Sequence, residues 1–152
     1  MPQRIRSRHT ITIGAPITTC FGLFTPAGEE RWVEGWKPTY VLPADGHTER
    51  DMVFVTGEGD ERTVWMLIEL DEAAHRLRYA RVTPASRTGY VDVQCRAVDD
   101  GRTEVTVGYM LTALSASGFE RLADYEGEPF VAMIEGWRDS IHRMLQRDAS
   151  AR

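Results

Sequence analysis

The stretch VDVQCRAVDDGRTEVTVGYMLTA, residues 91–113, decides the fold of this chain. Apolar and polar residues alternate on both sides of Asp100-Gly101, a dipeptide favoured in tight turns between antiparallel strands. One face of both predicted strands is apolar: Val91, Val93, Cys95 and Ala97, then Val105, Val107, Tyr109, Leu111 and Ala113. We therefore expect a β-hairpin with one buried and one exposed face, as in an antiparallel sheet.

Similar alternation predicts strands over much of the remaining chain. Between the first two strands, Pro16 ends the extended stretch, and a short helix is expected over 17–24. A second helix is expected from Pro26 to about Gly35, with Thr25 as its N-cap. The predicted strands, in chain order, cover residues 4–13, 39–43, 51–57, 62–71, 76–84, 87–98 and 102–114.

The C-terminal part has a helical period. We expect a short helix near 116–125, a break at Gly127, and a main helix over 129–147, because Gly and Pro disfavour a helix interior. The main helix carries one apolar stripe: Phe130, Met133, Ile134, Trp137, Ile141, Met144 and Leu145. This order predicts a single α+β domain over residues 1–152, in which a curved sheet surrounds the helix and leaves a cavity between them.

Composition excludes several classes of protein. The net charge of −5 and the pI of about 5.4 argue against nucleic-acid binding, which depends on Lys and Arg neutralising phosphates. Arg4, Arg6 and Arg8 alternate with other residues and fit the solvent face of a strand. We see no apolar segment long enough for a signal peptide or a membrane span, so we expect a cytoplasmic protein.

Motifs for metal binding or catalysis are not apparent. Cys20 and Cys95 are too far apart for a metal motif or a disulfide framework, so two buried free thiols are expected. The histidines are scattered without the spacing of zinc ligands. Neither a Gly-x-Ser-x-Gly elbow nor a nucleotide-binding glycine loop occurs. We therefore predict no metal and no cofactor, and we assign no catalytic residue.

Four motifs along nearly the whole chain resemble bacterial members of the START-like superfamily, also called SRPBCC proteins, which include Bet v 1-like proteins. They are Phe21-x-Leu23-Phe24-Thr25-Pro26-x-Gly28-Glu29-x-x-Trp32-x-x-Gly35-Trp36-x-Pro38, Thr63-Val64-Trp65, Tyr79-x-Arg81-Val82-x-Pro84, and Tyr109-x-Leu111-Thr112-Ala113-Leu114-Ser115-x-x-Gly118. The resemblance implies the helix-grip fold. Its function is less defined, because the superfamily includes lipid carriers, plant hormone receptors and polyketide cyclases. Gly127–Pro129 departs from the smooth final helix of the family and leaves the shape of the cavity mouth open.

Candidate ligand-binding residues are those that strand and helix periodicity places toward the cavity. Ligand cavities are mainly apolar and aromatic with a few polar groups, although each aromatic residue could equally be a simple core residue. The predicted lining consists of Trp36, Tyr40, Phe54, Trp65, Tyr79, Arg81, Tyr109, Met133 and Trp137.

Arg81 is the most informative polar residue in this set. If Tyr79 faces inward, a period of two turns Arg81 inward as well. A buried guanidinium needs a carboxylate or an anionic ligand, and Glu69 on the preceding strand is a candidate partner. The alternative is that Arg81 lies near a strand end and reaches solvent.

The register of residues 62–71 is ambiguous, because Trp65 and Leu67 compete with apolar residues of the opposite parity: Val64, Met66, Ile68 and Leu70. If Trp65 and Leu67 faced outward, they would form an apolar patch suited to a homodimer or another partner. An interaction protein is therefore one hypothesis.

The leading hypothesis is binding of a small hydrophobic molecule, such as a lipid, a polyketide or an aromatic metabolite, in the cavity. The alternative is an enzyme of the polyketide cyclase, aromatase or dehydratase type acting in the same cavity. It would need an inward-facing acid–base set, for which the sequence offers Arg81, Glu69, Tyr79 and Tyr109.

Overall fold

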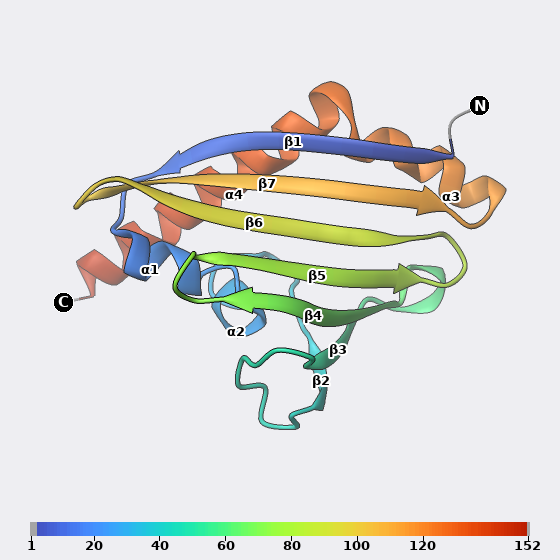
Figure 1. Ribbon diagram of the computed structural model, residues 1–152, viewed down its shortest axis with the longest axis horizontal. Helices are drawn as coiled ribbons and strands as arrows, with labels where there is room; N and C mark the ends of the chain where they lie inside the picture. Colours follow the sequence, from blue (N-terminus) through green and yellow to red (C-terminus); the bar gives the residue numbers. More distant parts are fainter. Residues whose placement is uncertain (1–2, 152) are drawn as a thin grey trace.

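The computed structural model describes residues 3–151 and consists of a curved antiparallel sheet with helices on one face (Figure 1). Seven strands follow the order β1-β7-β6-β5-β4-β3-β2. The long helix α4 (Gly127–Ser150) runs behind the sheet in the view of Figure 1, on the same side as α1 (Ile17–Gly22) and α2 (Pro26–Glu29). The predicted α+β, helix-grip architecture is confirmed.

The strands lie within a few residues of their predicted limits. Asp100 and Gly101 join the two longest strands, as the sequence predicted. The remaining bounds are β1 (Arg4–Ile13), β2 (Thr39–Leu42), β3 (Val53–Thr56), η1 (Gly59–Glu61), β4 (Thr63–Asp71), β5 (Arg76–Thr83), β6 (Arg87–Asp99), β7 (Arg102–Ala113), α3 (Ala116–Arg121) and η2 (Leu122–Tyr125).

The core forms where the inner face of the sheet meets α4. Val91 pairs with Tyr109 across β6 and β7, and Val93 pairs with Val107, so the predicted apolar face is continuous and buried. From α4, the apolar stripe contributes Phe130, Ile134, Ile141 and Met144 to the same core. Removing this surface from water stabilises the fold by roughly 25 cal/mol per Å². Both cysteines are buried and unpaired, as expected.

A β-bulge resolves the ambiguous register of β4. Trp65 and Leu67 face inward, and the pairing with β5 then shifts between Leu67 and Glu69. After this bulge Leu70 returns to the inner face opposite the buried Leu77. Odd-numbered residues face the core before the bulge, and the even-numbered Leu70 faces it after the bulge. A strict period of two does not predict this change.

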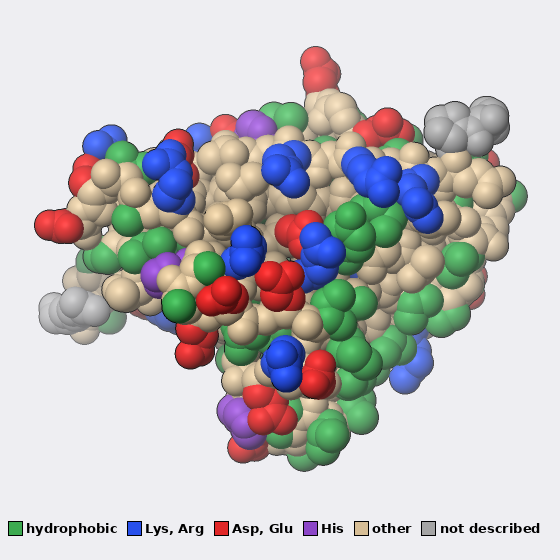
Figure 2. Space-filling view, viewed as in Figure 1, with side chains coloured by type: hydrophobic (Ala, Val, Ile, Leu, Met, Phe, Trp, Pro, Cys, Tyr) green, Lys and Arg blue, Asp and Glu red, His purple; other side chains and the backbone are tan. Residues whose placement is uncertain are grey.

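The outer face of the sheet carries the remaining apolar residues of β4. Met66 and Ile68 are exposed, and Val64 is half-buried beside Val82 of β5. Figure 2 shows hydrophobic side chains gathered in this part of the outer face, while charged side chains are more frequent over the strands β5, β6, β7 and β1. An outer apolar patch therefore exists, but Met66 and Ile68 form it, whereas Trp65 and Leu67 face inward.

Two helix limits differ from the predictions. Thr25 caps α2 as expected, its Oγ1 accepting a hydrogen bond from the Gly28 N–H, but α2 ends at Glu29 rather than near Gly35. Beyond Glu29 the chain continues in tighter turns, and the Trp32 indole packs into the core and donates to the Leu23 carbonyl. The helix α4 starts at Gly127, where glycine adopts a φ of +61° without steric cost.

Gly127 and Pro129 therefore start a helix rather than interrupt one. Pro129 lies in the first turn of α4, where backbone N–H groups have no partner within the helix and a missing one costs little. Over residues 3–151, no helix is both long enough and apolar enough to cross a membrane.

Candidate functional site

A cavity of about 160 Å³ lies between the inner face of the sheet and α4. It is assembled from elements far apart in sequence, since α2 and the segment after it, strands β3 to β7, η2 and α4 all contribute side chains. Its lining comprises Glu29, Val33, Trp36, Phe54, Trp65, Tyr79, Arg81, Val91, Val93, Tyr109, Tyr125, Met133 and Trp137. Every residue predicted to line a cavity is therefore present, with the exception of Tyr40.

One wall of the cavity is a cluster of aromatic rings. Phe54 and Trp65 stack in parallel, with ring centroids 5.9 Å apart. Trp36 and Tyr79 each meet both of these rings edge-on, at centroid distances between 5.9 and 6.0 Å. The indole N–H of Trp36 donates to the Pro26 carbonyl, so that this ring offers the cavity only apolar surface.

The lining also contains two further tyrosines, Tyr109 and Tyr125. Tyr109 stacks on Tyr125 with centroids 5.6 Å apart, and it also lies near Trp137 of α4. Burial raises the pKa of the Tyr109 hydroxyl above its usual range, because the phenolate would lose its water. Tyr79, by contrast, uses its hydroxyl to donate to the Phe24 carbonyl over 2.6 Å.

Tyr40 lies outside the cavity, which corrects the prediction for this residue. Its ring packs against Phe54, with centroids 6.3 Å apart, and its hydroxyl donates to a Glu30 carboxylate oxygen over 2.9 Å. Partial burial together with Glu30 raises the pKa of Tyr40 to about 12. Tyr40 precedes an irregularity in β2, which the sequence pattern did not reveal.

Arg81 is directed inward, as the strand period predicted, and only 7 % of its surface is exposed. Its guanidinium carbon lies 4.7 Å from the centre of the Trp65 ring, and Nη2 donates to Thr83 Oγ1 over 3.2 Å. The Nε–H group is buried without a hydrogen-bond partner among residues 3–151. Within the same residues no carboxylate lies within ion-pair distance of Arg81. Burial lowers the pKa of this guanidinium.

Glu69 does not pair with Arg81. The bulge in β4 places Glu69 opposite Arg78 in register, and its Oε1 lies 3.2 Å from Arg76 Nε. Glu69 contributes instead to a charged surface depression together with Arg76, Arg78 and Asp92. The predicted partner is therefore wrong, and the reason is the extra residue that shifts the register.

The other buried arginine, Arg87, does have a carboxylate partner. Glu61 accepts hydrogen bonds from Arg87 over 3.1 and 3.3 Å and from Arg121 over 2.9 Å. These two arginines lower the pKa of Glu61 to about 2. Arg87 also donates to the Tyr125 hydroxyl over 3.0 Å, which connects this ion-pair network to the cavity wall.

Two polar lining residues were not anticipated. Burial raises the pKa of the Glu29 carboxyl well above its usual range, because ionisation would place an unpaired charge in the cavity wall. Glu29 was not among the inward acid–base groups predicted from the sequence. Its spacing of three and four residues from Trp32 and Val33 was the available signal for an inward position. Tyr125 carried no such signal, because it ends the short 3-10 turn η2.

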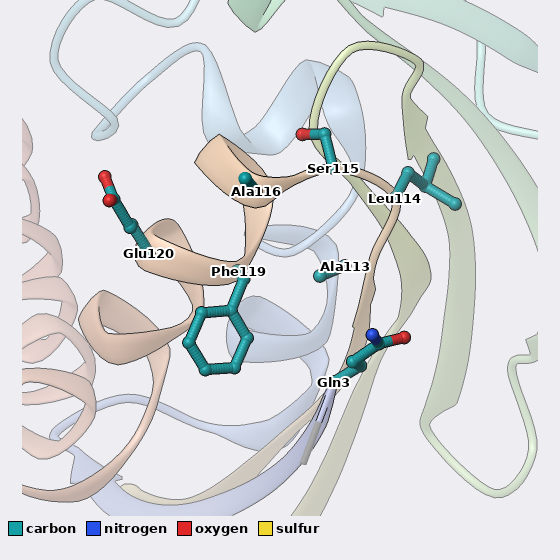
Figure 3. A pocket seen from close by; sticks show the side chains of 7 residues that line it. All are labelled: Gln3, Ala113, Leu114, Ser115, Ala116, Phe119 and Glu120. Carbon is teal, nitrogen blue, oxygen red and sulfur yellow. The ribbon is translucent and has the colours of Figure 1, made fainter. Parts of the chain in front are cut away.

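A larger hollow of about 690 Å³ lies on the surface near the end of β7. Figure 3 shows the Phe119 ring and the Gln3 side chain on facing sides of it. Its other walls come from Ala113, Leu114, Ser115, Ala116 and Glu120. No buried charged group lies among these residues, so the smaller inner cavity is the better candidate for a specific site.

The geometry defines a helix-grip protein with an aromatic cavity and a buried arginine, Arg81, that has no carboxylate of residues 3–151 within ion-pair distance. Searches among family models and curated proteins found no match. Solved structures do match: a Thermobifida fusca protein determined by NMR is 21 % identical with a TM-score of 0.68, over 91 % of this chain and 94 % of that one.

Two structures with assigned names are also similar. Norcoclaurine synthase from Thalictrum flavum, solved with dopamine and hydroxybenzaldehyde, is 8 % identical with a TM-score of 0.63, over 92 % of this chain and 87 % of that one. The Zhui aromatase/cyclase from Streptomyces sp. R1128 is 15 % identical with a TM-score of 0.55, over 97 % and 88 %. At these identities the likeness shows the fold alone, and it agrees with the helix-grip fold predicted from the sequence.

Proposed function

We propose that this protein binds a small hydrophobic molecule in the cavity between the sheet and α4. The supporting observation is the cavity of about 160 Å³ whose walls are mostly aromatic side chains. Binding would remove apolar ligand surface from water, which contributes roughly 25 cal/mol per Å². The few polar groups on the wall, with Arg81 foremost, would orient the ligand.

The similar structures are consistent with this proposal. The norcoclaurine synthase structure holds dopamine and hydroxybenzaldehyde, which are small aromatic molecules. A similar use of the cavity in this protein remains part of the proposal. Among the lipid, polyketide and aromatic ligands suggested by the sequence, we therefore favour an aromatic ligand.

The first test is native mass spectrometry of the purified protein, followed by denaturing extraction and identification of any retained compound. A matched pair of variants locates the site: Val91→Phe fills the cavity from β6, whereas Val55→Phe makes the same change at a half-buried position of β3 outside the lining. We expect Val91→Phe to lose the compound and Val55→Phe to retain it. Equal retention by both variants would place the compound elsewhere and contradict the proposal.

Catalysis in the same cavity is a second candidate, favoured by the two groups Glu29 and Tyr109. Burial raises the pKa of the Glu29 carboxyl and so favours its protonated form as a proton donor, and Tyr109 has no hydrogen-bond partner for its hydroxyl among residues 3–151. The test is conversion of the extracted compound by wild type and by Glu29→Gln. Conversion that Glu29→Gln loses while still binding the compound supports an enzyme, and no conversion by wild type supports a binding protein alone.

The remaining predictions from sequence concern partners and location. A homodimer would use the outer apolar patch around Met66 and Ile68, and sedimentation velocity on wild type and Met66→Glu tests it. The expected absence of nucleic-acid binding and the cytoplasmic location stay predictions.

A further inference from the structure

The two buried arginines of the sheet differ in how their charge is neutralised. Arg87 forms a bidentate pair with Glu61, and Arg121 donates a hydrogen bond to the same carboxylate. Among residues 3–151, Glu61 makes its ion pairs with Arg87 and Arg121 and acts on Arg81 only from beyond ion-pair distance. The Nε–H group of each arginine has no partner among residues 3–151, but Arg81 differs in having a single hydrogen bond, to Thr83, and no carboxylate of these residues within ion-pair distance.

Arg81 lines the cavity and has few side-chain neighbours across the sheet. Trp65, its cross-strand neighbour on β4, covers one face of the guanidinium. Its neighbour on β6 is Gly89, where a Cβ atom would lie 1.8 Å from the Met110 carbonyl oxygen, so that only glycine fits. No side chain of β6 can therefore stand beside Arg81 at this pair. A planar guanidinium held in this way matches the two oxygens of a carboxylate.

The size of the cavity limits what can accompany that carboxylate. An apolar protein cavity of about 150 Å³ accommodates one benzene ring, and the cavity here measures about 160 Å³. Fused rings or a long acyl chain would need more room. The stacked and edge-on rings of Phe54, Trp65 and Tyr79 give the cavity walls that suit a flat aromatic guest.

From these observations we infer that the ligand is a single-ring aromatic carboxylate, held with its carboxylate on Arg81 and its ring between the aromatic walls. The inference rests on the proposed function and adds the charge and the size of the ligand. Neutral compounds are disfavoured because they leave Arg81 without a counter-charge. Fused-ring compounds and fatty acids are disfavoured because their volume is too large for the cavity.

The test is isothermal titration calorimetry with benzoate and benzamide, which have nearly the same shape and differ in charge, together with 1-naphthoate and decanoate as larger acids. Three proteins are compared: wild type, Arg81→Met and Arg78→Met. Arg78 is the matched control because it lies on the same strand with its side chain on the opposite face, paired with Asp92. Arg78→Met removes the same charge without touching the cavity.

For wild type we expect benzoate to bind at least about 10-fold more tightly than benzamide, as a charge-assisted hydrogen bond provides. Arg81→Met should abolish that preference, and Arg78→Met should retain it. Benzamide binding as tightly as benzoate, a preference that survives Arg81→Met, or tighter binding of 1-naphthoate or decanoate would each overturn the inference while leaving a hydrophobic binding site in place.

A different result would remove the proposed function itself. If none of the four compounds binds wild type and native mass spectrometry finds no retained compound, both the proposal and the inference fail together. Should Arg81→Met not fold, the ratio of benzoate to benzamide affinity in wild type decides the inference alone, because it requires no variant.

Discussion

Arg81 and Arg87 are buried on neighbouring strands, and their different surroundings predict opposite effects of the same substitution. Arg81→Met removes a guanidinium that has no carboxylate partner in the structure described, at the loss of one hydrogen bond to Thr83 and the contact with Trp65. Replacing buried ionic groups with apolar residues of similar volume is often neutral or stabilising. We expect the free energy of unfolding to rise by about 1 kcal/mol.

Arg87→Met should have the opposite sign. It separates Glu61 from its bidentate partner and leaves the Tyr125 hydroxyl without its donor. We expect a loss of about 2 kcal/mol, below the value for a fully buried pair because Glu61 is partly exposed and keeps Arg121. Urea unfolding of both variants measures the two changes. A loss in Arg81→Met as large as that in Arg87→Met would show that Arg81 is a structural residue rather than a ligand-binding one.

Glu29 gives a second prediction at this scale, concerning pH. Its pKa is raised in the folded state, so above the ordinary value of 4.5 the unfolded chain ionises while the folded chain keeps the proton. Stability is therefore complete below about pH 4.5 and decreases as pH rises through the folded-state pKa. We expect Glu29→Gln to unfold like wild type near pH 4 and to be more stable near pH 7, as measured by urea unfolding. A difference that does not depend on pH would contradict this role of burial.

At the scale of elements, the sequence predicted what depends on local pattern. The hairpin at Asp100-Gly101 follows from alternation and turn chemistry, and the cap at Thr25 follows from a single hydrogen bond. The bulge after Leu67 was not predictable, because it depends on which residue of β5 fits opposite β4. That one shift decides that Glu69 lies outside the cavity while Trp65 lies inside.

The same limit applies to the candidate site. Strand parity was sufficient to predict Phe54, Tyr79 and Arg81 on the cavity, because they lie in regular stretches of strand. The prediction that Tyr40 lines the cavity was wrong because β2 is short and irregular. Glu29 was missed although its spacing placed it on the same side of the predicted helix as Trp32 and Val33, because how that side packs against the sheet is a tertiary property that local periodicity does not determine.

Two glycines test the packing of helical elements. At Gly118 of α3 a Cβ atom would lie 1.8 Å from the Ser86 carbonyl oxygen, whereas at Gly136 of α4 no atom lies within 4 Å. We expect Gly118→Ala to cost about 2 kcal/mol, since the helix must move away from the turn before β6. Gly136→Ala should add about 0.8 kcal/mol from helix propensity alone. Thermal and urea unfolding measure both, and a destabilised Gly136→Ala would show an additional role for that position.

The ion-pair network around Glu61 connects η1, β6 and α3, and it predicts a pH dependence opposite to that of Glu29. Its pKa is lowered to about 2, so the network stabilises the fold above the ordinary pKa of 4.5 and loses this contribution as pH falls toward about 2. We expect Glu61→Gln to cost about 1 kcal/mol at neutral pH, allowing for its exposure to solvent.

Between about pH 4.5 and 2.5 the stability of wild type should approach that of Glu61→Gln. Glu72→Gln in the exposed turn between β4 and β5 is the control for a lost surface charge. Urea unfolding over this range measures the difference. Parallel pH profiles of wild type and Glu61→Gln would show that the network contributes nothing specific.

At the scale of the whole molecule, the cavity joins parts of the chain that have no local connection. Its walls come from α2, the middle of the sheet and α4, so that a bound ligand would contact both the sheet and the helix that crosses it. Ligand binding that favours the folded state raises the free energy of unfolding by about 2.7 kcal/mol at a free concentration 100 times Kd. We expect this gain with benzoate, measured by urea unfolding.

Hydrogen–deuterium exchange measures which segments the bound ligand stabilises. If the ligand lies in the cavity, exchange should slow in β5 and in the turn of α4 around Met133 and Trp137 at the same time, because the ligand bridges them. The turn at Asp100-Gly101 is the internal control, since it lies outside the lining of the cavity. Protection confined to α3 and the end of β7 would instead locate the ligand in the surface hollow of Figure 3, where neither Arg81 nor the aromatic walls could contribute to its binding.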